Sequence, residues 1–141
     1  MYITRKAEFS ASHVCRLPGL SDEENHAIYG EAARAHGHGH NYIVEVTLEG
    51  APDPVTGMIM DLKELKEILD REIVEPMDHR FLNYEVPPFD TVVPTAENVA
   101  QEIWRRLDRC LAVQSAGKLR RVRLYETADL YVDVEGAGLR S

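Results

Sequence analysis

Alternation of apolar and polar residues near both ends of the sequence constrains this chain more than any other feature. Residues 2–15 and 38–49 alternate with a period of two, and so do residues 119–126 and 129–135. A period of two places every second side chain on the same face of a β-strand. The pattern therefore predicts four strands, of which the last two form a hairpin.

Helical periodicity replaces this alternation in the middle of the chain. Apolar residues at spacings of three and four predict an amphipathic helix over 62–74. Thr95 is a good N-cap for a second helix over about 96–112. A Ser-x-x-Glu capping box predicts a short helix over 22–29, and the proline-rich stretch 75–94 is expected to be a loop.

The order of these elements predicts the fold class. Strand, strand, helix, helix, strand, strand gives an α+β domain with a four-stranded antiparallel sheet and both long helices on one face. A length of 141 residues fits a single domain over 1–141 with a core of its own. Such a sheet has two open edges, which edge-to-edge oligomerisation would cover.

Charge and cysteine content limit the classes of binding partner and the cellular compartment that we expect. Lys and Arg number 16 against 24 Asp and Glu, and a formal net charge of −8 argues against nucleic acid or an anionic membrane as a partner. No apolar run approaches the about 18 residues of a transmembrane helix, and the N-terminus lacks the apolar block of a signal peptide. Cys15 and Cys110 form no disulfide framework, so a reducing, cytoplasmic compartment is expected.

Three of the six histidines lie in a His-Gly repeat at residues 36–40. In an extended segment, His38 and His40 point to the same face and can present two imidazoles to one ion. His13, on the preceding strand, can supply a third across the ladder. Three neutral imidazoles with an open fourth position describe a catalytic zinc site, and iron or another divalent ion is the chemical alternative. On spacing alone, His36 and His38 could form the pair instead, or the repeat could be a flexible polar loop.

Six blocks along the chain carry a resemblance to a known family. They are Phe9-Ser10-Ala11-Ser12-His13, Leu20-Ser21-Asp22-Glu23-Glu24-Asn25, Gly37-His38-Gly39-His40-Asn41-Tyr42, Asp78-His79, Thr95-Ala96-Glu97-Asn98-Val99 and Tyr125-Glu126-Thr127. Together they resemble the 6-pyruvoyl-tetrahydropterin synthase family, which also contains the 6-carboxy-tetrahydropterin synthases of queuosine biosynthesis. The resemblance implies the tunnelling fold (T-fold), in which subunits join edge to edge into a barrel. It also implies a homohexamer built from two trimers, with active sites shared between subunits.

The resemblance further implies 7,8-dihydroneopterin triphosphate as the small-molecule substrate, and it assigns roles to single residues. The zinc ligands that it implies are His13, His38 and His40. Glu126 matches the glutamate that anchors the pterin, and a carboxylate can accept two N–H donors side by side from the guanidine-like edge of that ring. Thr95, the N-cap of the second helix, could also touch the pterin through its hydroxyl or the nearby backbone. Glu97 matches a glutamate that the family places near the ligand, although its place in the first helical turn could also serve the helix dipole alone. Asp78 and His79 match the acid–base pair, in which a carboxylate makes an imidazole a proton shuttle near neutral pH.

The triphosphate needs local cations, because the net charge of the chain supplies none. Three arginines near the family blocks are candidates, namely Arg16, Arg34 and Arg80. Each could equally be a solvated surface charge.

The chain departs from the family pattern at the catalytic base. The family has a cysteine a few residues before the His-Gly-His segment, whereas this chain has Ala32 there and no thiol in residues 16–37. Cys15 is the first candidate for a relocated base, since it shares the face of His13, roughly 7 Å along the strand, and a nearby cation favours a thiolate. Glu31 is the second candidate, because some relatives use a glutamate near this point and form 6-hydroxymethyl-dihydropterin.

The expected function is therefore a zinc-dependent lyase that eliminates triphosphate and forms 6-pyruvoyl-tetrahydropterin. The insertion around Ser21–Tyr29 resembles this branch of the family. Carbon–carbon cleavage to 6-carboxy-tetrahydropterin or 6-hydroxymethyl-dihydropterin is the alternative product chemistry. A non-catalytic pterin- or purine-binding module is the alternative of another class, because the usual cysteine is Ala32. A structural zinc domain, which would unfold on chelation, is the third hypothesis.

Overall fold

The computed structural model describes residues 1–113 and 117–136. The strands are β1 (Tyr2–His13), β2 (His38–Glu49), β3 (Arg80–Phe81), β4 (Lys118–Thr127) and β5 (Leu130–Glu135). The α-helices are α1 (Asp22–Tyr29), α2 (Leu62–Leu69), α3 (Glu75–Met77), α4 (Leu82–Glu85) and α5 (Ala96–Leu111). A 3-10 turn (Gly30–Ala33) follows α1, and a π-helical turn (Asp70–Val74) joins α2 to α3. Among the described residues, no helix is long and apolar enough to cross a membrane.

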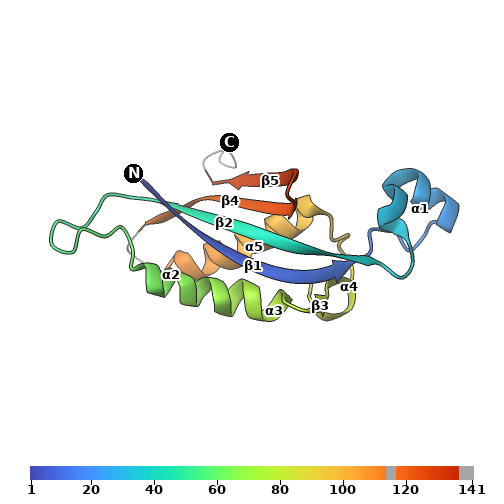
Figure 1. The fold of residues 1–141 in the computed structure, drawn as a ribbon, viewed down its shortest axis with the longest axis horizontal. Coiled ribbons are helices and arrows are strands. Elements are labelled where there is room, and N and C mark those ends of the chain that lie inside the picture. Colours follow the sequence, from blue (N-terminus) through green and yellow to red (C-terminus); the bar gives the residue numbers. More distant parts are fainter. Residues whose placement is uncertain (114–116, 137–141) are drawn as a thin grey trace.

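The strands form one sheet with the order β3-β1-β2-β4-β5 (Figure 1). β1 and β2 pair antiparallel along their whole length, from Tyr2 opposite Glu49 to His13 opposite His38. β2 with β4, and β4 with β5, are antiparallel as well. The α+β class and the four antiparallel strands are thus confirmed.

The fifth strand corrects the prediction of a four-stranded sheet. β3 lies within the proline-rich stretch that was expected to be a loop, and its two residues pair parallel with Ala11 and Ser12 of β1. Two residues are too short to show alternation, so the sequence carries no signal for this strand. The pairing follows instead from tertiary hydrogen bonds, in which the Ser10 N–H donates to Asp78 Oδ1 and the His79 N–H donates to the Ser10 carbonyl.

The long helices cover one face of the sheet, with α2, α3 and α5 on the same side (Figure 1). The helix-facing side chains of β2 are fully buried against them, including Tyr42 and Val46, and Ile103 and Leu107 of α5 belong to the same core. The predicted helix over 62–74 is present as α2 and the π-helical turn. This helical layer leaves the opposite face of the sheet uncovered.

The α1 segment projects beyond one end of the sheet (Figure 1). The Ser21–Glu24 capping box begins the helix as predicted. Buried Asn25 organises the loop before the helix, accepting from the Leu17 N–H and donating to the carbonyl oxygens of Leu17, Leu20 and Ser21.

After the α1 segment, the chain returns to the end of β1, and Gly37 is the constrained residue of this return. The Cys15 N–H donates to the Ala32 carbonyl at 2.8 Å. Gly37 then adopts φ 71°, and a Cβ there would lie 2.8 Å from the His13 carbonyl oxygen. Only glycine fits this combination of positive φ and close backbone approach. The chain can therefore enter β2 with His38 directly opposite His13.

Candidate metal and ligand site

Three histidine side chains meet where β1 ends and β2 begins. His13 and His38 face each other on the last rung of the ladder, and His40 lies two residues further on the same face. One ring nitrogen from each histidine lies within 4.8 Å of the others, and His13 Nε2 is 3.1 Å from His38 Nε2. His36 is exposed and lies outside this group. The structure therefore brings together His13, His38 and His40, the combination implied by the family resemblance.

Burial of two histidines of the cluster, His13 and His40, favours their neutral form. Burial lowers the pKa of His13 to about 4, and burial also lowers the pKa of His40. His13 Nδ1 lies 2.7 Å from the Pro94 carbonyl oxygen. A carbonyl there fixes Nδ1–H as the donor and leaves Nε2 with a lone pair, as in histidines that ligate metals.

The donor set fits a divalent metal. His40 Nε2 is buried and has no hydrogen-bond partner among residues 1–113 and 117–136. An orphaned ring nitrogen beside two further imidazoles is the arrangement that a bound cation satisfies. Zinc fits a three-imidazole set with one open position, and other first-row divalent ions share this preference.

Acidic and hydroxyl groups from two further elements lie on the same side of the sheet. Glu126, near the end of β4, places Oε1 at 3.3 Å from His40 Nε2. Burial raises the pKa of Glu126, and the charge of Glu97 adds to this effect. Thr95 caps α5 by accepting from the Asn98 N–H, and it follows the Pro94 carbonyl that holds His13. The structure thus places Glu126, Thr95 and Glu97 around the histidine cluster.

Cys15 lies behind the His13 ring rather than at the ligand side of the cluster. Its Sγ is 3.9 Å from His13 Nδ1 and 3.8 Å from the Pro94 carbonyl oxygen. Burial, and then the charges of Glu126 and Glu97, raise the pKa of the Cys15 thiol to about 11. The contact with Ala32 places Cys15 beside the position of the family's usual cysteine. The thiol is therefore close to the site but protonated at neutral pH.

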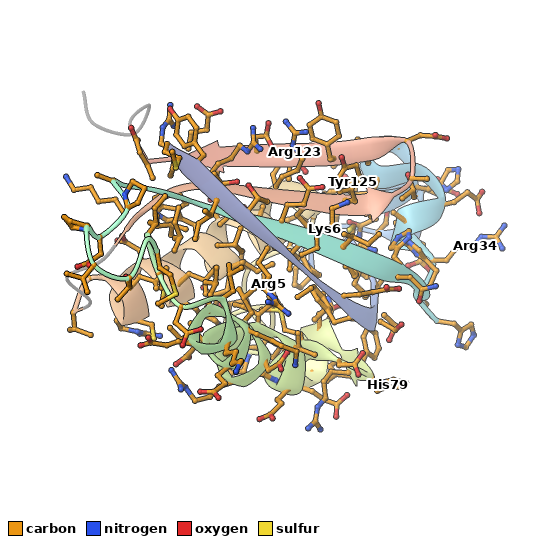
Figure 2. All side chains as sticks on the ribbon, turned by 60° about the vertical axis from the view of Figure 1, so that its left-hand side comes forward. Arg5, Lys6, Arg34, His79, Arg123 and Tyr125 are labelled. Carbon is orange, nitrogen blue, oxygen red and sulfur yellow. The ribbon has the colours of Figure 1, made fainter. Side chains whose placement is uncertain are left out.

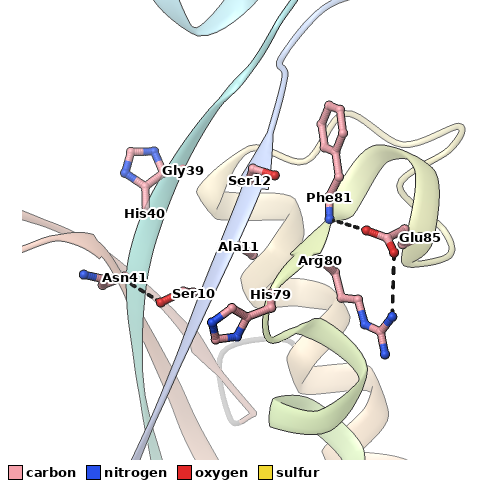
Figure 3. A pocket seen from close by; sticks show the side chains of 10 residues that line it. All are labelled: Ser10, Ala11, Ser12, Gly39, His40, Asn41, His79, Arg80, Phe81 and Glu85. Carbon is pink, nitrogen blue, oxygen red and sulfur yellow. Dashed lines mark hydrogen bonds and ion pairs between the residues drawn. The ribbon is translucent and has the colours of Figure 1, made fainter.

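Asp78 and His79 form a pair at the β3 edge of the sheet. Asp78 Oδ2 lies 2.8 Å from His79 Nδ1, and the hydrogen bond from Ser10, followed by that of His79, lowers the pKa of Asp78. His79 is largely exposed and borders an open pocket of about 540 Å³ with Ser10 and Asn41 (Figure 3). Ser10 and Asn41 alternate with core-facing neighbours, so their side chains point away from the helices. The same pocket is lined by His40 as well, so it connects the pair at the β3 edge with one member of the histidine cluster (Figure 3).

The candidate phosphate-binding arginines all have carboxylate partners within the described residues. Arg16 pairs with Asp22 at 2.7 Å and Arg80 with Glu85 at 3.6 Å. Arg34 pairs with Glu31, and Figure 2 shows Arg34 extending into solvent. The same ion pair places Glu31, the second candidate base, on the surface.

Comparison with known proteins decides the family. The family model described as 6-pyruvoyl tetrahydropterin synthase matches residues 2–137. The chain belongs to this family. It is 46% identical over 134 residues to the 6-pyruvoyl tetrahydrobiopterin synthase of Pongo abelii, and 45% identical to that of Homo sapiens, covering 95% of this chain and 90% of each relative. The Caenorhabditis elegans 6-pyruvoyl tetrahydropterin synthase superposes with a TM-score of 0.89 at 35% identity, covering 96% of this chain and 95% of that structure.

Two groups at the site were missed by reasoning from the sequence. The Pro94 carbonyl is a backbone group, and no residue pattern marks it as a partner of His13. Tyr42 could have been found, because it lies two residues after His40 on the same face of β2. Among residues 1–113 and 117–136, its buried hydroxyl has no hydrogen-bond partner.

Proposed function

We propose that the protein is a metal-dependent lyase that converts 7,8-dihydroneopterin triphosphate to 6-pyruvoyl-tetrahydropterin and releases triphosphate. One observation carries this proposal. Three clustered imidazoles lie beside Glu126 in a chain that is 45–46% identical, over 95% of its length, to proteins named 6-pyruvoyl tetrahydrobiopterin synthase. The imidazoles suit a Lewis-acidic cation, and the carboxylate suits a ring edge with adjacent N–H donors.

We assign the metal as Zn²⁺ and its ligands as His13, His38 and His40. Held by these three histidines, a zinc ion would supply Lewis-acid chemistry, the polarisation of a substrate oxygen. The protein contributes orientation, since the Pro94 carbonyl holds the His13 ring and Gly37 allows His38 to approach it. Burial contributes as well, because it keeps the rings of His13 and His40 unprotonated and available.

Glu126, Thr95 and Glu97 are proposed to bind the pterin. Glu126 accepts two N–H donors from the guanidine-like edge of the ring. Thr95 Oγ1 accepts from the Asn98 N–H, so its own hydrogen is free to donate to the ligand. Glu97, in the first turn of α5, adds negative charge that raises the proton affinity of Glu126.

Proton transfer is assigned to Asp78 and His79, with Cys15 as the other candidate base. The Asp78 carboxylate orients the His79 ring, which is exposed and can exchange protons with a substrate. The raised pKa of Cys15 and its place behind His13 make the thiol the weaker base. Removal of a side-chain proton, its return to the pterin ring and loss of triphosphate rearrange the existing electrons, so no external oxidant or reductant is needed.

A second copy of the chain would complete the site. Within one chain, the pocket beside His79 is lined by His40 but not by His13, His38 or Glu126, so we propose that a neighbouring subunit brings its His79 pair to the metal site. Among the residues that the structure describes, no strand pairs with the outer edge of β5 or with most of the outer edge of β1, so both can pair edge to edge with another copy. These features support a homohexamer of single-domain subunits spanning residues 1–141. The two free thiols, Cys15 and Cys110, support a reducing cytoplasm.

Mass spectrometry of the products tests this proposal. The zinc-loaded protein is incubated with 7,8-dihydroneopterin triphosphate, and the expected products are 6-pyruvoyl-tetrahydropterin and triphosphate. A pterin of 6-carboxy or 6-hydroxymethyl mass, together with a released aldehyde, would replace elimination by carbon–carbon cleavage. Unchanged substrate, with zinc and pterin bound, would favour the non-catalytic module suggested by Ala32.

A further inference from the structure

Two buried polar atoms close to Glu126 have no hydrogen-bond partner in the described ranges 1–113 and 117–136. They are His40 Nε2 and Tyr42 Oη. A bound cation accounts for the ring nitrogen, but the proposed roles so far give the tyrosine hydroxyl nothing to bind. Buried tyrosine hydroxyls usually have a partner, and an unpaired one calls for an explanation.

The strand register places Tyr42 beside Glu126. Ile43 pairs with Tyr125, so the next rung brings Tyr42 next to Glu126, with both side chains on the helical face. On its other side, the Tyr42 ring stacks on Phe9 with centroids 5.0 Å apart and planes inclined by 13°. The Tyr42 ring is therefore fixed between Phe9 and the strand position of Glu126.

The Glu126 carboxylate is itself poorly held. Among the described residues, its one polar contact is His40 Nε2 at 3.3 Å, and this contact does not have the geometry of a hydrogen bond. A cation bound to Nε2 takes the lone pair of that nitrogen and leaves no hydrogen for Glu126. Before the ligand binds, the metal-loaded site thus leaves this carboxylate without a donor among the described residues, and Tyr42 is the adjacent one.

A loosely held carboxylate beside a three-histidine site could also bind the metal and occupy its open position. Carboxylate oxygens are good zinc ligands, and a catalytic site must keep its fourth position open. Glu126 lies within contact distance of one histidine of the cluster, so a small rotation could turn it toward the ion. A hydrogen bond to a fixed donor would oppose that rotation.

We propose that Tyr42 is a positioning residue whose hydroxyl donates a hydrogen bond to the Glu126 carboxylate when the histidine cluster holds its metal. The bond keeps Glu126 directed at the ligand and away from the ion. This inference deepens the proposed function and rests on it for the identity of the ligand. A charge-assisted hydrogen bond of this kind is short and strong, and it adds orientation as well as affinity.

The test compares Tyr42→Phe with the matched control Tyr125→Phe. Tyr125 lies on the uncovered face of the same strand pair, where its ring is tilted against that of Tyr131 with centroids 5.1 Å apart, so its hydroxyl does not reach the site. Addition of Zn²⁺ is expected to shift the near-ultraviolet tyrosine absorption of the wild type and of Tyr125→Phe, and to leave Tyr42→Phe unshifted. Tyr42→Phe should keep one metal ion per chain, bind 7,8-dihydroneopterin triphosphate about 10-fold more weakly, and show the loss mainly in KM.

Two results would overturn the proposal: a zinc-induced shift that persists in Tyr42→Phe, or unchanged ligand affinity in that variant. Glu126→Gln, which keeps every tyrosine, decides the question if Tyr42→Phe does not fold, and it should weaken the zinc-induced shift. Failure of the proposed function is distinct. In that case the wild type does not bind 7,8-dihydroneopterin triphosphate, while a zinc-induced shift that depends on both Tyr42 and Glu126 still supports the contact.

Discussion

At the scale of single residues, burial decides which groups of the site carry charge. His13 and Tyr42 are buried and neutral, Cys15 is buried and protonated, and Glu126 has a raised pKa. His79, by contrast, is exposed and paired with Asp78. The buried groups are thus suited to bind a cation and a neutral ring edge, and the exposed pair is suited to move protons. The same effect of burial on charge can be tested at His13 and at Cys15.

The first prediction concerns the pH dependence of folding through His13. Its native pKa of about 4 lies below the ordinary value of 6.5, so between these values the unfolded chain binds a proton that the native chain does not. For the chelator-treated protein, the free energy of unfolding should therefore fall by about 3 kcal/mol as pH drops through this window. Urea titrations at several pH values measure it, and His13→Gln should lose this part of the slope. An equal slope in both proteins would contradict the assignment.

The second prediction concerns Cys15. Because its thiol is buried and protonated, Cys15→Ala should keep its metal and its turnover within about 10-fold, while a small cavity costs about 1 kcal/mol of stability. Steady-state kinetics and thermal unfolding measure the two effects. A loss of turnover of more than about 100-fold, with pterin affinity intact, would instead assign the base to the thiol.

At the scale of elements, local signals predicted most of the fold. Alternation predicted both ends of β2, and the capping box predicted both ends of α1. The prediction failed at β3 because its pairing depends on contacts between residues far apart in sequence. The π-helical turn after α2 was missed for a similar reason, since its residues have ordinary helical periodicity. At the site, the strand pattern predicted that the histidines group together. It could not predict that the Pro94 carbonyl contacts His13, or that each candidate arginine pairs with a carboxylate.

The third prediction concerns the N-terminus of α5. Thr95 caps this helix and is also proposed to bind the ligand. Thr95→Ala should cost about 1 kcal/mol of stability and weaken pterin binding, because both the acceptor and the donor are lost. Thr95→Ser keeps the hydroxyl and should restore both properties. Denaturation measures stability and fluorescence titration measures binding. If Thr95→Ala loses stability alone, its role is confined to the cap.

At the scale of the whole molecule, the two halves of the proposed chemistry lie at different places on the sheet. The histidine cluster lies beside Glu126 at the junction of β1 and β2, and the Asp78–His79 pair lies at the β3 edge, beside a pocket that His40 also lines. An antiparallel sheet with open edges pairs readily with further copies, and closed rings of such sheets remove those edges. Assembly would therefore place the proton-transfer pair of one subunit at the metal site of the next.

The last prediction tests this arrangement by mixing two inactive variants. His38→Ala should lose the metal, with His36→Ala as a control that keeps it, and His79→Ala should keep the metal but lose proton transfer. If each site combines a cluster from one chain with His79 from another, random co-assembly of His38→Ala and His79→Ala restores about a quarter of the wild-type sites. The variants are unfolded and refolded together, and turnover is compared with that of each variant refolded alone. If both groups of a site come from one chain, every mixed site lacks one of them and no activity returns.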